Sequence, residues 1–340
     1  MNPLQATHGG SDALGVPAFD FSTNANACGP CPAALAAVQA ADPRHYPDPA
    51  STALIEALAR FHGVAPERIV PAASASEFIG RITAWVARAG GTRVWRPAHA
   101  YGDYAHAAAA WRLAPVHGPA QADLAWLCEP ASPTGGPEPA AADVAAQAAT
   151  VVLDRAYEPL RLSGRSSLDT RDLDRVWQLW TPNKALGLTG VRGAYAIAPA
   201  GAEDAAQDLR ALAPSWPLGA HAEAMLLAWT TPAAQQWLRD SLDTLRAWKA
   251  QQVALCEALG WTVLPGGANF FVARLADAAQ AGLLPALRRA HGVKLRDCAS
   301  FGLPGHVRLG VRPPDEQRAL QQAWRAAAGD NRRPVQEESP

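Results

Sequence analysis

The sequence has little of what marks several common classes of protein. It has 30 basic and 31 acidic residues, so its net charge of -1 offers no basic excess for nucleic acid or an anionic membrane. No run of about 18 apolar residues occurs, so we expect no membrane-spanning helix. Five cysteines in 340 residues are too few for a disulfide scaffold, and the N-terminus lacks the pattern of a signal peptide. We therefore expect a soluble cytoplasmic protein.

Sequence signatures of several kinds of functional site are also missing. The nine histidines show no metal-binding spacing, so we expect no metal. Neither the glycine-flanked serine of hydrolases nor the glycine fingerprint of dinucleotide-binding enzymes occurs. Cys28 and Cys31 have thioredoxin-like spacing, but polar residues precede them where that motif needs a strand, so we interpret them as loop cysteines.

Lysine is scarce as well. Only Lys184, Lys249 and Lys294 occur, whereas arginine supplies the other basic residues. A lysine retained against this bias can do what arginine cannot, such as lose its proton and act as a nucleophile. Lys249 lies in a helical pattern and Lys294 beside a strand pattern, and we expect both to be solvent-exposed.

The apolar patterning indicates an α/β protein with two lobes. Hydrophobic residues make up 49% of the chain, and between about residues 66 and 198 short apolar runs alternate with helical patterns, which favours a mainly parallel sheet covered on both faces. The expected strands are 68–70, 93–96, 124–128, 150–153, 176–180 and 194–197, and helices are expected at 77–89 and 104–112. An amphipathic helix over 232–259 leads to a smaller α+β lobe with strands at 261–264, 270–272 and 307–311 and a closing helix from Asp315.

These patterns suggest a domain organisation with a cleft between two domains. We expect an N-terminal arm and first helix at 1–45, which contribute to the smaller domain and the substrate site. A large domain at 46–230 and a small C-terminal domain at 231–328 follow, and a disordered tail at 329–340 ends the chain.

Four chemically distinctive side chains are expected at one edge of the sheet. Asp154 and Tyr157 follow the strand 150–153, and Lys184 and Arg192 follow the strand 176–180. The carboxyl ends of parallel strands are where such sheets bind ligands. This set matches the needs of pyridoxal phosphate: a lysine for the Schiff base, a carboxylate for the ring nitrogen, a tyrosine for the ring 3-oxygen and an arginine for the phosphate.

Two further elements of a cofactor site follow from the same reasoning. Residues 72–77 open a helix after a strand, so Ala75 and Ser76 can offer backbone N–H groups to the phosphate. Tyr101, in the loop after the strand 93–96, is placed to cover the ring face.

The stretch from Asp154 to Arg192 resembles fold-type I pyridoxal-phosphate enzymes of the aminotransferase superfamily. Within that group the chain is most similar to the threonine-phosphate decarboxylases of cobalamin biosynthesis, which are related to histidinol-phosphate aminotransferases. The motifs that carry the resemblance are His8-Gly9-Gly10, the segment 20–26, His45-Tyr46-Pro47-Asp48, the segment 296–299 and the segment 308–312. The first two favour the decarboxylase.

The resemblance implies a set of binding residues. Arg308 would hold the substrate α-carboxylate, with Arg312 as the alternative. Arg296, with His8 and Asn24, would hold the substrate phosphate. Tyr46 would reach the cofactor phosphate of a partner subunit, which implies a homodimer.

Some positions depart from the family pattern. Ser132 stands where the family has an asparagine that bonds the ring 3-oxygen. The phosphate loop before the lysine is reduced to Thr181-Pro182-Asn183, so Thr181 and Asn183 would form an altered cradle.

Three functions follow. The main expectation is decarboxylation of L-threonine O-3-phosphate to (R)-1-amino-2-propanol O-2-phosphate through a Lys184 Schiff base. The alternative is an aminotransferase of histidinol-phosphate type that acts on a phosphorylated or other amino acid, with Lys184 as general acid/base. The third is a non-catalytic protein that binds pyridoxal phosphate, which the intact lysine, aspartate and arginine argue against.

Overall fold

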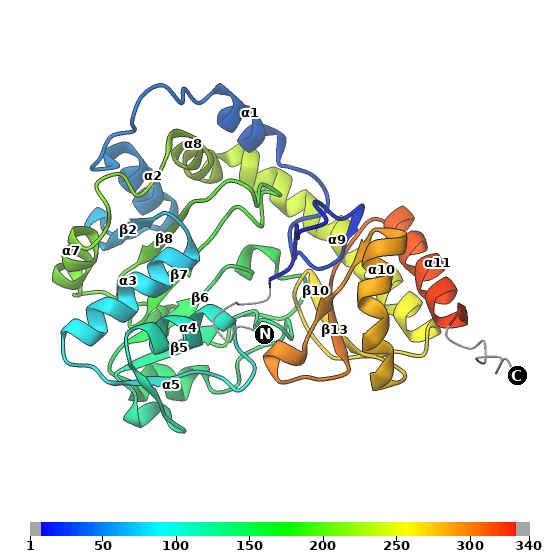
Figure 1. Cartoon of the computed structure of the whole chain (residues 1–340). Coiled ribbons are helices and arrows are strands. Elements are labelled where there is room, and N and C mark those ends of the chain that lie inside the picture. Colours follow the sequence, from blue (N-terminus) through cyan, green and yellow to red (C-terminus); the bar gives the residue numbers. More distant parts are fainter. Residues whose placement is uncertain (1–7, 331–340) are drawn as a thin grey trace, which may run out of the picture.

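The computed structural model describes residues 8–330, which form two lobes joined by the long helix α9 (Pro232–Ala258) (Figure 1). Pro232 is the first residue of that helix, and the Thr231 hydroxyl accepts a hydrogen bond from the Ala234 backbone N–H. Proline at this position and a threonine N-cap are typical of a helix start.

The larger lobe is built on a seven-stranded sheet in the order β2-β8-β7-β6-β5-β3-β4. The strands are β2 (Ile69–Ala72), β3 (Arg93–Trp95), β4 (Ala114–Pro115), β5 (Leu124–Cys128), β6 (Val151–Asp154), β7 (Trp177–Trp180) and β8 (Ala194–Ile197). Strand β8 is antiparallel to both of its neighbours, and the other neighbouring pairs are parallel. The prediction of a mainly parallel central sheet is confirmed.

Helices cover both faces of this sheet (Figure 1). One face packs against α3 (Ala75–Arg88), α4 (Gly102–Ala110) and α7 (Glu203–Ala211). The other packs against α1 (Pro32–Ala40), α2 (Thr52–His62), α5 (Ala141–Gln147) and α8 (Ala220–Trp229), while the short α6 (Thr170–Leu173) precedes β7. Burial on both faces explains why these strands are apolar along their whole length.

The smaller lobe contains a four-stranded antiparallel sheet in the order β12-β13-β10-β9. Its strands are β9 (Thr262–Val263), β10 (Phe270–Arg274), β12 (Arg296–Asp297) and β13 (His306–Gly310). Helices α10 (Leu284–His291) and α11 (Pro314–Asp330) share its core. A separate two-stranded parallel ladder pairs β1 (Phe19–Asp20) with β11 (Val293–Lys294) and so ties the N-terminal arm to this lobe.

The arm contacts both lobes. Phe21 is fully buried in the core of the smaller lobe, whereas Cys31 and Ala34 are buried against the larger lobe. The expected domain boundaries stay a prediction. Of the expected tail, Gly329 and Asp330 belong to α11, and 331–340 lie outside the described residues. Within the described range, no helix has the length and apolar character needed to cross a membrane.

Candidate active site

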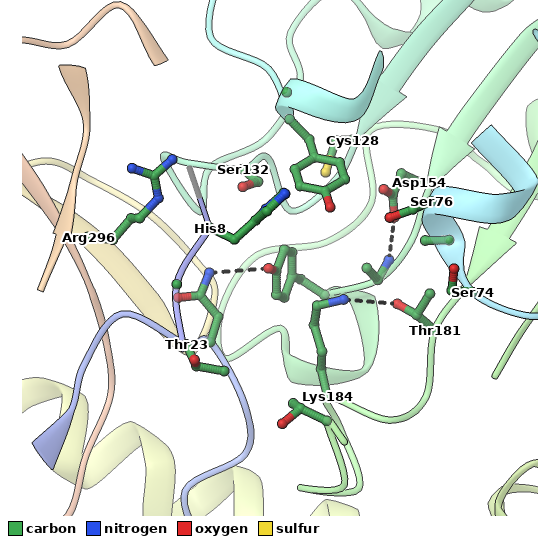
Figure 2. Close-up of a pocket in the computed structure, with 18 of the residues that line it drawn as sticks. His8, Thr23, Ser74, Ser76, Cys128, Ser132, Asp154, Thr181, Lys184 and Arg296 are labelled. Atoms are coloured by element: carbon green, nitrogen blue, oxygen red, sulfur yellow. Dashed lines mark hydrogen bonds between the residues drawn. The ribbon is translucent and has the colours of Figure 1, made fainter. Parts of the chain in front are cut away.

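A cavity of about 630 Å³ lies at the carboxyl ends of β5, β6 and β7, where the sheet faces strands β12 and β13. This is the edge at which open α/β sheets bind ligands. Apart from Tyr46, all the predicted site residues line this cavity: His8, Asn24, Ala75, Ser76, Tyr101, Ser132, Asp154, Tyr157, Thr181, Asn183, Lys184, Arg192, Arg296 and Arg308. Figure 2 shows Lys184 and Asp154 entering it from different segments, with Arg296 across from Asp154 in this view.

Lys184 projects into the cavity from a loop that the N-terminal arm holds in place. The Asn26 backbone N–H donates to the Lys184 carbonyl at 2.9 Å, and the Asn26 side chain donates to the Ala185 carbonyl at 3.1 Å. Lys184 Nζ lies 3.4 Å from the Thr181 hydroxyl and 5.4 Å from the centre of the Tyr157 ring. The lysine is therefore fixed at its backbone, while its amine faces the space that a ligand would fill.

The other two lysines are not exposed as predicted. Lys249 donates to the carbonyls of Gly266 and Ala268, and burial lowers its pKa to about 8. Lys294 donates to the Gly10 carbonyl at 2.6 Å and forms an ion pair with Asp12. Both predictions were wrong because segments distant in sequence fold over these side chains. Lys184 is the lysine that lines the cavity.

Asp154 is the last residue of β6 and is buried. One carboxylate oxygen accepts from the Ala156 backbone N–H at 2.9 Å, and the other accepts from the Tyr104 hydroxyl at 2.8 Å. Burial raises the pKa of this carboxyl, and the nearby Lys184 charge opposes that shift. Tyr104 was not predicted as a site residue, because a tyrosine in an alanine-rich helix carries no sign of the strand end that it will face.

Aromatic side chains form the walls around the lysine. The Tyr157 hydroxyl accepts from the Asn24 side-chain amide at 3.3 Å, and its ring meets Phe270 edge-on at 4.6 Å. Tyr101, at the start of α4, has its ring centre 6.1 Å from that of His8. Asn24 thus contacts a predicted cofactor residue, and its side-chain oxygen is buried without a partner in the described structure.

The N-terminus of α3 forms another wall. Ser74 caps this helix by accepting from the Glu77 backbone N–H, which leaves Ala75 and Ser76 in its first turn beside the cavity. The Ser76 hydroxyl donates to Asp103 at 2.5 Å. Arg192 lines the same cavity. A helix N-terminus together with an arginine is a suitable anion site.

Two arginines make the side of the cavity that belongs to the smaller lobe positive. Arg296 and Arg308 are directly opposite each other on β12 and β13, so their side chains lie on one face of that sheet. The Arg308 guanidinium donates to the Ser132 hydroxyl at 3.2 Å and to the Ser22 carbonyl at 3.0 Å. Both guanidiniums lie over the Phe301 ring. Burial and the charge of Arg308 lower the pKa of Arg296, so an anionic ligand would relieve repulsion here.

Arg312, the alternative to Arg308 for binding the substrate carboxylate, lies outside the cavity. It forms a bidentate contact with Glu316 of α11. Its charge is already balanced within its own lobe.

Tyr46 lies away from this cavity. The residue is 78% exposed, and its ring stacks on Trp216 with 4.4 Å between the ring centres. Pro43, Pro47 and Leu218 line a second pocket together with this aromatic pair. The contact of Tyr46 with a partner subunit stays a prediction.

The two loop cysteines show no sign of redox pairing. Cys28 and Cys31 are both free thiols, and Cys31 is fully buried. Burial raises the pKa of the Cys28 thiol to about 11, so it stays protonated at neutral pH. A protonated thiol is a poor nucleophile.

The residues present fit pyridoxal phosphate. The cavity joins an amine, a buried carboxylate and a phenol with a helix N-terminus, and it also contains polar atoms that have no hydrogen-bond partner among residues 8–330. Those atoms are the side-chain oxygens of Asn24 and Asn183 and the Nε of Arg308. Buried polar atoms without partners are costly, which indicates that a polar ligand completes this site.

Comparisons with protein families and with known proteins both point to aminotransferases. A model of the family described as aminotransferase class I and II matches residues 16–323. The histidinol-phosphate aminotransferase of Halorubrum lacusprofundi is 28% identical over 316 residues, which cover 86% of this chain and 84% of that protein.

Solved structures share the fold. The histidinol-phosphate aminotransferase from Sinorhizobium meliloti, in complex with pyridoxal-5'-phosphate, matches with a TM-score of 0.80 and 22% identity, covering 97% of this chain and 98% of that one. The L-threonine-O-3-phosphate decarboxylase from Porphyromonas gingivalis matches with a TM-score of 0.75 and 21% identity, covering 91% of this chain and 99% of that one.

These findings overturn the expected decarboxylation of L-threonine O-3-phosphate. Sequence relatives that match over most of the chain are named histidinol-phosphate aminotransferases, and the decarboxylase is a structural neighbour whose likeness shows the fold alone. The motifs that favoured it have an architectural explanation. A Cβ on Gly9 would stand 2.1 Å from the Ser22 carbonyl oxygen, and Asn26 holds the loop of Lys184. Such packing serves either reaction.

The family model spans most of the chain, and the cavity contains the lysine and carboxylate predicted from the strand ends. This chain belongs to the aminotransferase class I and II family.

Proposed function

We propose that this chain is an aminotransferase of histidinol-phosphate type, which acts on a phosphorylated or other amino compound. Its cofactor is pyridoxal 5'-phosphate, as its family indicates. The observation that carries the proposal is the meeting of Lys184 and Asp154 in one cavity whose opposite side holds two arginines. The names of the sequence relatives support transfer of an amino group as the reaction.

Each group has a role that its surroundings support. The bound cofactor would supply an electron sink for the carbanion formed at the substrate carbon. Lys184 Nζ would bind the cofactor and then carry the proton that leaves and returns to the substrate. Asp154 would face the ring nitrogen, and Tyr157 the ring 3-oxygen.

Anionic groups of the ligands would be divided between two ends of the cavity. The first turn of α3, with Arg192, Thr181 and Asn183, would hold the cofactor phosphate. Arg308 would hold a substrate carboxylate, and Arg296 with His8 and Asn24 would hold a substrate phosphate. Ser132 is engaged by Arg308, which supports a role on the substrate side as well as beside the ring.

The active form would be a homodimer in which Tyr46 contacts the cofactor phosphate of the partner subunit. The exposure of Tyr46 and its stacking on Trp216, outside the cavity of its own chain, support this arrangement. Its substrate is a small molecule, and the near-neutral charge of the chain gives no basic surface excess for nucleic acid.

The test is a transfer assay on protein loaded with pyridoxal phosphate. Histidinol phosphate is supplied as amino donor with a 2-oxo acid as acceptor, and formation of the new amino acid is measured. We expect transfer by the native protein and none by K184A. Release of CO2 from L-threonine O-3-phosphate without any transfer activity would contradict the proposal.

A further inference from the structure

Tyr104 is a fully buried residue of α4 whose hydroxyl is directed at Asp154. Its ring stacks on Trp126 of β5, with 4.5 Å between centres and 4° between planes, and meets Tyr101 edge-on at 5.7 Å. These contacts on both sides fix where the hydroxyl points. The oxygen lies 2.8 Å from the Asp154 carboxylate.

Asp154 is in an environment that opposes its charge. It is buried at the end of β6, and burial is the main cause that raises its pKa. The charged or titratable groups that face it are Lys184 after β7, Cys128 of β5, and Asp103 and Tyr104 of α4. Lys184 favours the ionised carboxylate and Asp103 disfavours it.

Two hydrogen bonds favour the ionised form of Asp154. They come from the Ala156 backbone N–H and the Tyr104 hydroxyl, one to each carboxylate oxygen. Burial raises the pKa of Tyr104 well above 10, so this hydroxyl keeps its proton and stays a donor. In the proposed function the Lys184 amine is consumed in binding the cofactor, which leaves these two groups as the permanent donors.

We propose that Tyr104 is a positioning residue that keeps Asp154 ionised and aimed at the ring nitrogen of the cofactor. The proposal rests on the proposed function, in which Asp154 faces that nitrogen. Hydrogen bonds to a charged form lower the pKa of a carboxyl, and removing a donor raises it again. The protonation of the ring nitrogen therefore depends on a tyrosine that does not line the cavity.

The experiment compares native protein with Y104F. The affinity for pyridoxal phosphate is measured between pH 5 and 8, and the protonation of the ring nitrogen is read from the 15N NMR shift of labelled cofactor. In Y104F we expect the acidic limb of the affinity profile to move to higher pH. At neutral pH we expect affinity about tenfold weaker, since a hydrogen bond to a charged group is lost. The ring-nitrogen signal should move toward the unprotonated value.

The matched control is Y195F. Tyr195 is also fully buried, but its hydroxyl contacts Trp229 and His62 on the other face of the sheet. A merely structural loss of a buried hydroxyl would lower the stability of both variants alike. Only Y104F should move the pH profile and the ring-nitrogen signal.

A double-mutant comparison with D154N separates charge from packing. If Tyr104 acts through the charge of Asp154, Y104F has no further effect on either readout in the D154N background. Should Y104F alone fail to fold, D154N should restore folding by removing the buried charge. Failure of the double variant to fold would show that Tyr104 serves packing alone and would overturn the proposal.

The outcomes also separate this proposal from the proposed function. If native protein binds no pyridoxal phosphate, the proposed function itself fails. If native protein binds it and Y104F matches the native profile and 15N shift, the role of Tyr104 is refuted and the proposed function stands.

Discussion

Individual residues of the cavity differ in how far the sequence reveals them. Lys184 and Asp154 could be predicted because strand ends of a parallel sheet converge, and because lysine is rare in this chain. Tyr104 could not, since its partner lies 50 residues away. Lys249 and Lys294 were mispredicted for a related reason, because carbonyls and a carboxylate from remote segments surround them.

Replacement of Arg308 by glutamine tests the positive side of the cavity. The variant loses a charge that is buried among Phe270, Phe301 and the Ser132 hydroxyl. We expect KM for an anionic substrate to rise at least about tenfold, because hydrogen bonds to charged groups contribute about 1.5–3 kcal/mol. The absorption band of the lysine-bound cofactor should stay. The control R312Q removes an arginine paired with Glu316 and should leave KM unchanged.

At the scale of elements, buried strands were predicted best. Strands β5 and β8 have the predicted bounds, because a strand buried on both faces is a continuous apolar run. The direction of β8 could not be predicted, since an apolar run looks the same in either orientation. No strand range was predicted for β1, β4, β11 or β12; each has two residues and no longer apolar run around it.

The loop after Lys184 depends on a glycine. Gly187 has a φ of +68°, and a Cβ there would stand 2.5 Å from the Gly29 carbonyl oxygen. We expect G187A to lower the free energy of unfolding by about 1–3 kcal/mol and to weaken cofactor binding, because the loop must shift. Denaturant unfolding and cofactor titration measure these effects. The control G190A has open space around the new methyl group and should change stability by less than about 0.5 kcal/mol.

His62, the last residue of α2, should make the stability of the protein depend on pH. His62 contacts the Tyr195 hydroxyl, and burial lowers its pKa from 6.5 to about 4. The unfolded chain takes up this proton at higher pH than the folded protein. The contribution of His62 to the free energy of unfolding is therefore complete above pH 6.5. It is lost as the pH falls toward 4, and the free energy of unfolding decreases by up to about 3 kcal/mol.

Urea unfolding at pH 7 and pH 5 measures this dependence. H62Q removes the titrating group, so its free energy of unfolding should fall less between pH 7 and pH 5 than that of native protein. H117Q removes an exposed histidine and should lose as much stability as native protein. Equal loss in H62Q and native protein would show that other groups cause the acid sensitivity.

For the molecule as a whole, the cavity exists because two lobes and one arm meet. Strand ends of the larger sheet supply Asp154, the smaller sheet supplies Arg296 and Arg308, and the arm supplies His8 and Asn24. The two-lobe α/β architecture could be predicted from alternating patterns, whereas the choice between decarboxylation and amino transfer could not. The motifs at 8–10 and 20–26, which favoured the decarboxylase, hold the N-terminal arm and the loop of Lys184 in place. Both reactions need this arrangement.

The proposed function depends most directly on the binding of pyridoxal phosphate by Lys184 in this cavity. The most direct measurement is a titration of the purified protein with the cofactor, followed by visible absorbance, for native protein, K184A and the control K249M. We expect a saturable visible band in native protein and K249M that is absent in K184A. A band that persists in K184A, or the absence of a band from native protein, would contradict the binding of pyridoxal phosphate by Lys184.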